Sequence, residues 1–221
     1  MDILTPDVVT DVIFDGYMDS YDSTVRTEQT RVQIGRPEWW YVTELMGAAW
    51  KPPQGDDTYL LVRFSFSLEP PEGHTIEQVR LTAQLEGVPQ QLMPVAYDLF
   101  PSDVTEEVQR DVKLTFAPSL KLQEVEASIG SVESTIRISR VEPVISALGL
   151  GTASPAWAIR KHPKHPLIGS RLFYAVIAYP SAATRIEIHL DLTATVQAGR
   201  FGLWRLKTPD TSRATLTRLI P

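Results

Sequence analysis

Residues 59–68, YLLVRFSFSL, decide the fold class of this chain. Apolar residues stand at every second position, with Arg63, Ser65 and Ser67 among the positions between them. Because successive side chains of a strand point to opposite faces, this alternation predicts a strand with one buried face. The residues of the apolar face are Leu60, Val62, Phe64, Phe66 and Leu68.

Further strand-like runs follow on both sides of this stretch. Residues 76–85 alternate in the same way, and we expect them to pair with 59–68 across the turn-forming residues 69–73. Gly130 and Gly199 each separate two such runs and predict hairpins. Since no long helical period lies between the runs, the sequence predicts an all-β, antiparallel, two-sheet β-sandwich of immunoglobulin-like or jelly-roll character. The other runs are 25–34, 91–97, 111–116, 120–128, 131–141, 156–161, 171–179, 185–197 and 200–206.

The two ends of the chain differ in composition from the middle. Residues 1–22 carry six Asp and neither Lys nor Arg, whereas residues 160–221 carry ten Lys and Arg against three acids. We predict an acidic N-terminal arm or short helix over 1–23, a sandwich domain over 24–207, and a partly disordered tail over 208–221. The apolar side chains within the arm predict that it packs on the basic C-terminal third, in the same chain or in a second copy.

Two adjacent tryptophans, Trp39 and Trp40, begin a segment that the strand formers around them favour as a strand over a helix. In a strand the two indoles point to opposite faces, so one of them is outside the main core. Such a side chain either packs in a second layer or anchors a partner. Trp39 and Trp40 are therefore predicted protein-contact residues.

A basic loop around residues 160–171 is the second candidate site. Its cationic and imidazole side chains suit an anion or an acidic partner, because guanidinium and ammonium groups form charge-assisted hydrogen bonds. A metal site is not expected there, since the flanking charges repel a cation and two prolines prevent a helix. The predicted contact residues are Arg160, Lys161, His162, Lys164, His165 and Arg171.

Catalytic and cofactor signatures are missing from the sequence. There is no cysteine, so disulfides and thiolate chemistry are excluded. No GxSxG, HExxH, SxxK or phosphate-loop pattern occurs, and we predict no catalytic residue, cofactor or metal. The net charge of −6 argues against nucleic acid. With no signal-like leader and no apolar run long enough for a bilayer, a cytoplasmic protein without membrane contact is predicted.

These observations predict a non-catalytic protein-binding or adaptor module in a multi-protein or self-associating assembly. The prediction rests on a strong strand pattern without convergent reactive side chains. The alternative is a module that binds an anionic small molecule or a nucleotide through the 160–171 loop. A hydrolase-type enzyme is the third hypothesis.

Overall fold

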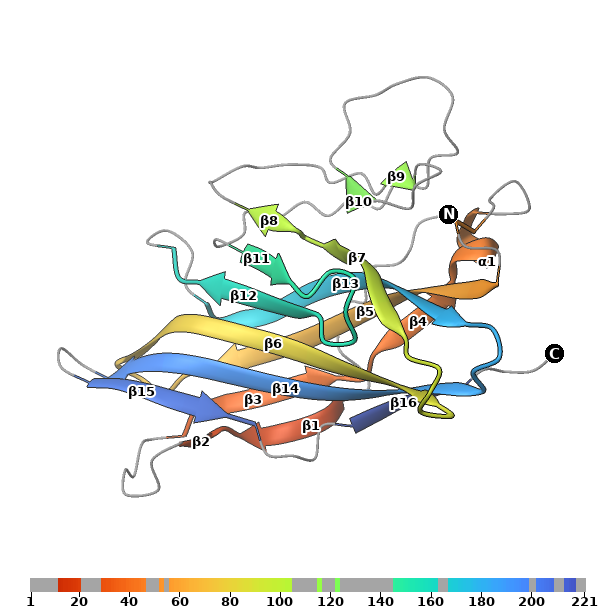
Figure 1. Ribbon diagram of the computed structural model, residues 1–221. Coiled ribbons are helices and arrows are strands. Elements are labelled where there is room, and N and C mark those ends of the chain that lie inside the picture. Colours follow the sequence, from red (N-terminus) through yellow and green to blue (C-terminus); the bar gives the residue numbers. More distant parts are fainter. Residues whose placement is uncertain are drawn as a thin grey trace.

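Two antiparallel sheets packed face to face form the body of the protein (Figure 1). The computed structural model describes residues 12–20, 29–46, 52–53, 56–104, 115–116, 122–123, 145–162, 167–198, 202–208 and 213–217. The predicted antiparallel two-sheet β-sandwich is therefore confirmed. The hairpin expected around Gly130 lies outside the described residues.

The first sheet has six strands, and its central strand is β5. The order is β1-β3-β5-β13-β7, and β4 pairs with β5 next to β3. Its strands are β1 (Val12–Tyr17), β3 (Arg31–Gly35), β4 (Glu38–Tyr41), β5 (Asp57–Glu69), β7 (Val95–Phe100) and β13 (Gly169–Pro180). The short helix α1 (Val42–Met46) follows β4 directly.

The second sheet has eight strands, and the long pair β6 and β14 forms its centre. The order is β2-β15-β14-β6-β12-β11-β8, and β16 pairs with β14. Its strands are β2 (Asp19–Ser20), β6 (His74–Val88), β8 (Asp103–Val104), β11 (Ile145–Leu148), β12 (Ala156–Arg160), β14 (Arg185–Ala198), β15 (Gly202–Lys207) and β16 (Arg213–Thr217). A separate two-stranded pair consists of β9 (Thr115–Phe116) and β10 (Leu122–Gln123).

The main core lies between the sheets, where the apolar faces of β5 and β13 meet those of β6 and β14. The alternation read from residues 59–68 and 76–85 is confirmed, since all the apolar positions of both runs that we assigned inward are at most 3% exposed. At the centre Trp157 is fully buried, with its ring centroid 5.6 Å from Phe64 and 5.3 Å from Phe173.

The pairing of residues 59–68 with 76–85 is wrong. Strand β5 pairs with β13 and β6 pairs with β14, so the consecutive strands β5 and β6 lie in different sheets. The four residues between them include Gly73 at a φ of 76°, a left-handed conformation that glycine adopts without strain. Alternation reports which side chains are buried, but it contains no information on which sheet a strand joins. By contrast, the hairpin predicted at Gly199 is confirmed, because β14 and β15 pair from Ala198 and Gly202 onward.

A second, smaller core lies on the outer face of the six-stranded sheet. Helix α1 and Trp40 pack there against Tyr59, Leu61 and Tyr174. Trp39 instead packs against the main core, so the two indoles do point to opposite faces as predicted. Both faces of β5 are buried in consequence, including Arg63 and Ser65.

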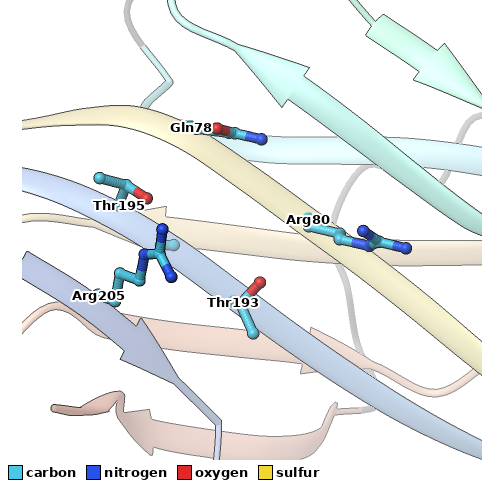
Figure 2. Close-up of a pocket in the computed structure, with 6 residues that line it drawn as sticks. Gln78, Arg80, Thr193, Thr195 and Arg205 are labelled. Atoms are coloured by element: carbon cyan, nitrogen blue, oxygen red, sulfur yellow. The ribbon is translucent and has the colours of Figure 1, made fainter. Parts of the chain in front are cut away.

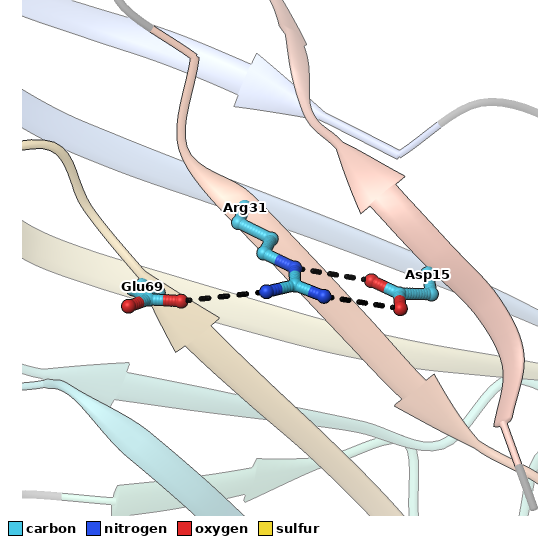
Figure 3. A network of polar contacts seen from close by, with 3 residues as sticks. All are labelled: Asp15, Arg31 and Glu69. Carbon is cyan, nitrogen blue, oxygen red and sulfur yellow. Dashed lines mark hydrogen bonds and ion pairs between the residues drawn. The ribbon is translucent and has the colours of Figure 1, made fainter.

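Within the predicted N-terminal arm, the described residues 12–20 form β1 and β2. Asp15 of β1 accepts two hydrogen bonds of 3.2 Å from Nε and Nη2 of Arg31 on β3, and Arg31 Nη1 lies 4.0 Å from Glu69 (Figure 3). The Arg31 guanidinium, mainly through these hydrogen bonds, lowers the pKa of Asp15. The network joins three adjacent strands of the first sheet. Strand β2 pairs with β15 of the second sheet. The segment of residues 12–20 therefore contributes one strand to each sheet.

Candidate functional site

A polar hollow of about 510 Å³ lies on the outer face of the eight-stranded sheet (Figure 2). Three neighbouring strands supply its lining, and all the lining residues except Ala194, which is buried in the main core, stand at positions that alternation directs away from the core. Arg205 lies across β14 near Thr193 and Thr195, and Arg80 lies on the other side of Thr193 (Figure 2). The lining residues are Gln78 and Arg80 of β6, Thr193, Ala194 and Thr195 of β14, and Arg205 of β15.

The strand register fixes how these residues are arranged. Gln78 pairs with Thr195, and Thr195 pairs with Arg205, so these three form one row across the sheet. Arg80 pairs with Thr193 in the next row. Because neighbouring strands lie about 4.8 Å apart, the hydroxyl groups of the two threonines lie between the two arginines.

The charge of the hollow is positive. Arg80 and Arg205 are exposed, and neither forms an ion pair with a carboxylate among the described residues. Asp191, two positions from Thr193 on β14, lies 3.5 Å from the hydroxyl of Thr208. The lining therefore offers guanidinium, hydroxyl and amide donors without a lining carboxylate, and this set of groups suits a negatively charged oxygen ligand.

The residues predicted in the 160–171 loop do not gather at one place. Arg160 ends β12 on the outer face of the eight-stranded sheet, whereas Arg171 stands opposite Phe66 in the other sheet, at one end of the main core. Lys161 forms a 2.7 Å ion pair with Glu77, and His162 is half-buried. Lys164 and His165 lie outside the described residues. Of the four that the structure describes, Arg160 is placed by its register on the same sheet face as the hollow.

A second polar cluster surrounds Arg63, beneath the layer formed by Trp40 and α1. The Arg63 side chain is 5% exposed, forms an ion pair with Glu38, and has its guanidinium 5.5 Å from the centre of the Trp40 ring. Tyr174 stands directly opposite Arg63 on β13. Burial raises the pKa of Tyr174, while the charge and hydrogen bonding of Arg63 lower it by less. Apolar side chains of the second core surround Arg63, and the cluster reaches solvent through Glu38, whose side chain is 50% exposed.

The raised pKa of Tyr174 predicts a stability loss in alkaline solution. In the unfolded chain a tyrosine titrates near pH 10. Since the folded state keeps this proton more tightly, the stabilisation is complete below about pH 10 and declines as pH rises above that value. We expect Tyr174→Phe to flatten this decline in urea unfolding measured between pH 8 and 11. Tyr17→Phe, at a half-exposed position, is the control, and an equal slope for Tyr174→Phe and wild type would contradict the prediction.

The sequence contained a signal for part of the hollow. The alternation of residues 76–85 places Arg80 on the solvent face of its strand, whereas in the run 200–206 Arg205 shares its face with Phe201 and Leu203 and the pattern assigns it no direction. It could not show that the two arginines face the same hollow, because they are separated by 125 positions and meet only through the pairing of β6, β14 and β15.

Two searches of the described residues gave negative results. No group of three or more His, Cys, Asp or Glu side chains is placed to hold a metal ion within the part of the chain that the structure describes. None of the described helices has the length and apolar character required to span a membrane.

Similarity to known proteins is found in structure only. No family model and no curated protein matches the sequence. A structure described as a pore-forming protein matches 90% of this chain and 93% of its own, at 10% identity and a TM-score of 0.42. The NetB toxin of Clostridium perfringens in its membrane-inserted form matches 90% and 92%, at 9% identity and 0.38. The delta-toxin of the same organism matches 87% and 90%, at 10% identity and 0.36.

These matches contradict our functional predictions from the sequence. The matched proteins are described as a pore-forming protein and as toxins, one of them membrane-inserted, and not as cytoplasmic adaptors. We therefore withdraw the adaptor module, its anionic-ligand alternative at the 160–171 loop, the cytoplasmic location and the absence of membrane contact. The adaptor, the location and the absence of membrane contact rested on a missing motif or leader, which does not report what the surface of a sandwich binds, and the anionic-ligand alternative rested on a cluster of basic residues in the sequence. The β-sandwich itself stands.

Proposed function

We propose that the protein binds a phosphate or sulfate group in the hollow between Arg80 and Arg205. One observation carries the proposal: two exposed arginines without a described carboxylate partner flank a polar hollow on a sheet face. A guanidinium group donates two parallel hydrogen bonds to such an oxyanion, and threonine hydroxyls complete its coordination. No group in the lining repels an anion.

Five of the six lining residues have polar side chains, and these side chains support a ligand with hydrogen-bonding groups. Small-molecule sites commonly have volumes of about 300–1,000 Å³, and this hollow of about 510 Å³ falls within that range. It is much larger than one phosphate or sulfate group, so the bound group belongs to a larger molecule. The sheet scaffold holds the two threonines and the arginine Cα atoms in a fixed register, and only the long side chains adjust on binding.

Thermal unfolding in sodium sulfate tests the proposal. A ligand at ten times its Kd stabilises the folded state by about 1.4 kcal/mol, so sulfate is expected to raise the melting temperature of the wild type above that in sodium chloride of equal ionic strength. Arg80→Gln and Arg205→Gln are expected to lose most of this additional rise, because each removes one guanidinium from the hollow.

The control variant is Arg185→Gln, which removes the same charge from β14 outside the hollow. Arg185 is paired with Glu187 at 2.7 Å. Sulfate also stabilises proteins generally by exclusion from their surface, and this general effect is expected to persist in all variants. If Arg80→Gln and Arg205→Gln respond to sulfate as strongly as Arg185→Gln does, the hollow is not an oxyanion site.

A further inference from the structure

The hollow is part of a longer band of positive charge that crosses the eight-stranded sheet. Arg160 pairs with Gln78 in the register of β12 and β6, which places it in the same row as Thr195 and Arg205. Lys207 pairs with Thr193 and so extends the row of Arg80. We call Arg160, Arg80, Arg205 and Lys207 the cationic band.

The described carboxylates near the cationic band lie at its Lys207 end or are already paired. Arg160 is exposed and forms no ion pair with a carboxylate in the described ranges. Glu77, next to Gln78 on β6, is already paired with Lys161. Lys207 stands opposite Asp19 of β2, and Asp191 lies on the same face two positions from Thr193, so the excess of positive charge lies at Arg160, Arg80 and Arg205. The charge excess of the band thus contrasts with a chain whose net charge is −6.

The length of the cationic band exceeds that of one oxyanion. Arg160 and Arg205 are three strand spacings apart, about 14 Å, and a single phosphate or sulfate cannot bridge them. A ligand that contacts both arginines must carry at least two anionic groups. Such a molecule lies across the strands, with one group in the hollow and the next near Arg160.

The side chains around the cationic band discriminate between classes of polyanion. The two tryptophans of these strands belong to the inner side: Trp157 is fully buried, and the Nε1 of Trp204 is buried. No aromatic ring lines the hollow, so the bases of single-stranded nucleic acid have no surface to stack on. Leu203, an exposed apolar residue on this face, lies two positions before Arg205 and outside the lining.

We infer that the ligand of the hollow is a linear acidic polysaccharide with sulfate groups, which lies across β12, β6, β14 and β15. The inference rests on the proposed function, because the Arg80–Arg205 hollow holds the first sulfate and Arg160 contacts the next. Recognition is by charge and hydrogen bonding along the cationic band, and it does not require stacking.

Calorimetric titration with a sulfated, heparin-derived octasaccharide tests this inference on the full chain. The wild type is expected to bind the octasaccharide and not an unsulfated octasaccharide. Arg160→Gln is expected to weaken binding about two- to fivefold, the range for loss of one exposed charge contact, and to leave the response of melting temperature to sulfate unchanged. Arg205→Gln is expected to reduce both the binding of the octasaccharide and the response of melting temperature to sulfate. Arg185→Gln is expected to reduce neither of them.

The outcomes separate the two proposals. If Arg160→Gln binds the octasaccharide like the wild type while Arg205→Gln loses the sulfate response, the extended ligand is wrong and the oxyanion site stands. If Arg80→Gln and Arg205→Gln keep the sulfate response, the proposed function itself fails. Vesicles containing phosphatidylserine form the second arm: binding to them that depends on Arg80 and Arg205, without binding to the octasaccharide, overturns the polysaccharide in favour of a lipid headgroup.

Discussion

Replacing Trp157 by alanine is expected to lower the free energy of unfolding by about 3–5 kcal/mol, the largest single effect we foresee. The indole is fully buried between the two sheets and touches aromatic rings of both β5 and β13. Its removal leaves a cavity that the rigid sheets cannot close, so the loss of buried area and the cavity both contribute. Urea unfolding followed by circular dichroism measures the difference.

Two further variants make the Trp157 prediction specific. Trp157→Phe keeps an aromatic ring and removes the indole N–H, which has no hydrogen-bond partner, so it is expected to cost clearly less than alanine. Leu203→Ala removes an apolar side chain that is 70% exposed, and is expected to change stability by no more than about 0.5 kcal/mol. A cost below about 1 kcal/mol for Trp157→Ala would show that the core between the sheets is packed differently.

Glu38→Gln is expected to destabilise the protein by about 3 kcal/mol, although the side chain of Glu38 is 50% exposed. The reason is that its ion-pair partner, Arg63, is buried. The side chain of Arg63 is 5% exposed, and the substitution removes the ion-pair partner of a charge that is held out of solvent. The Trp40 ring and Tyr174, which also lie beside Arg63, stabilise a cation more weakly than a carboxylate does.

The matched control is Glu187→Gln, which makes the same substitution in the exposed ion pair with Arg185. Here the side chains are 48% and 38% exposed, and the expected loss is at most about 1 kcal/mol. The double variant Arg63→Met with Glu38→Gln is expected to recover most of the stability, because it removes the buried charge as well. Equal losses for Glu38→Gln and Glu187→Gln would mean that Arg63 is solvated in the folded protein.

The alternation of the chain determined which residues are buried in the main core. The inward positions assigned to residues 59–68 and 76–85 were correct, and with them the two-sheet class. This success has a local cause, since the direction of a side chain along a strand follows from the backbone alone. The same pattern marked Arg63 and Ser65 as outward-facing, yet both are buried, because α1 and Trp40 cover that face.

The arrangement of strands was decided by packing between distant segments. Strand β5 pairs with β13 and strand β6 pairs with β14, each about a hundred residues later in the chain. No local feature of the sequence identifies these partners. The residues of the predicted basic loop are separated for this reason. Arg160 lies in the eight-stranded sheet and Arg171 lies in the six-stranded sheet.

By itself, the sequence determined the fold class, the core positions of residues 59–68 and 76–85, and the solvent-facing direction of Arg80. Only the tertiary structure decided that Arg80 and Arg205 flank one hollow and that Arg160 continues their band. The physical reason is that side-chain alternation depends on neighbouring residues, whereas strand order and register depend on how whole apolar faces fit together across the core.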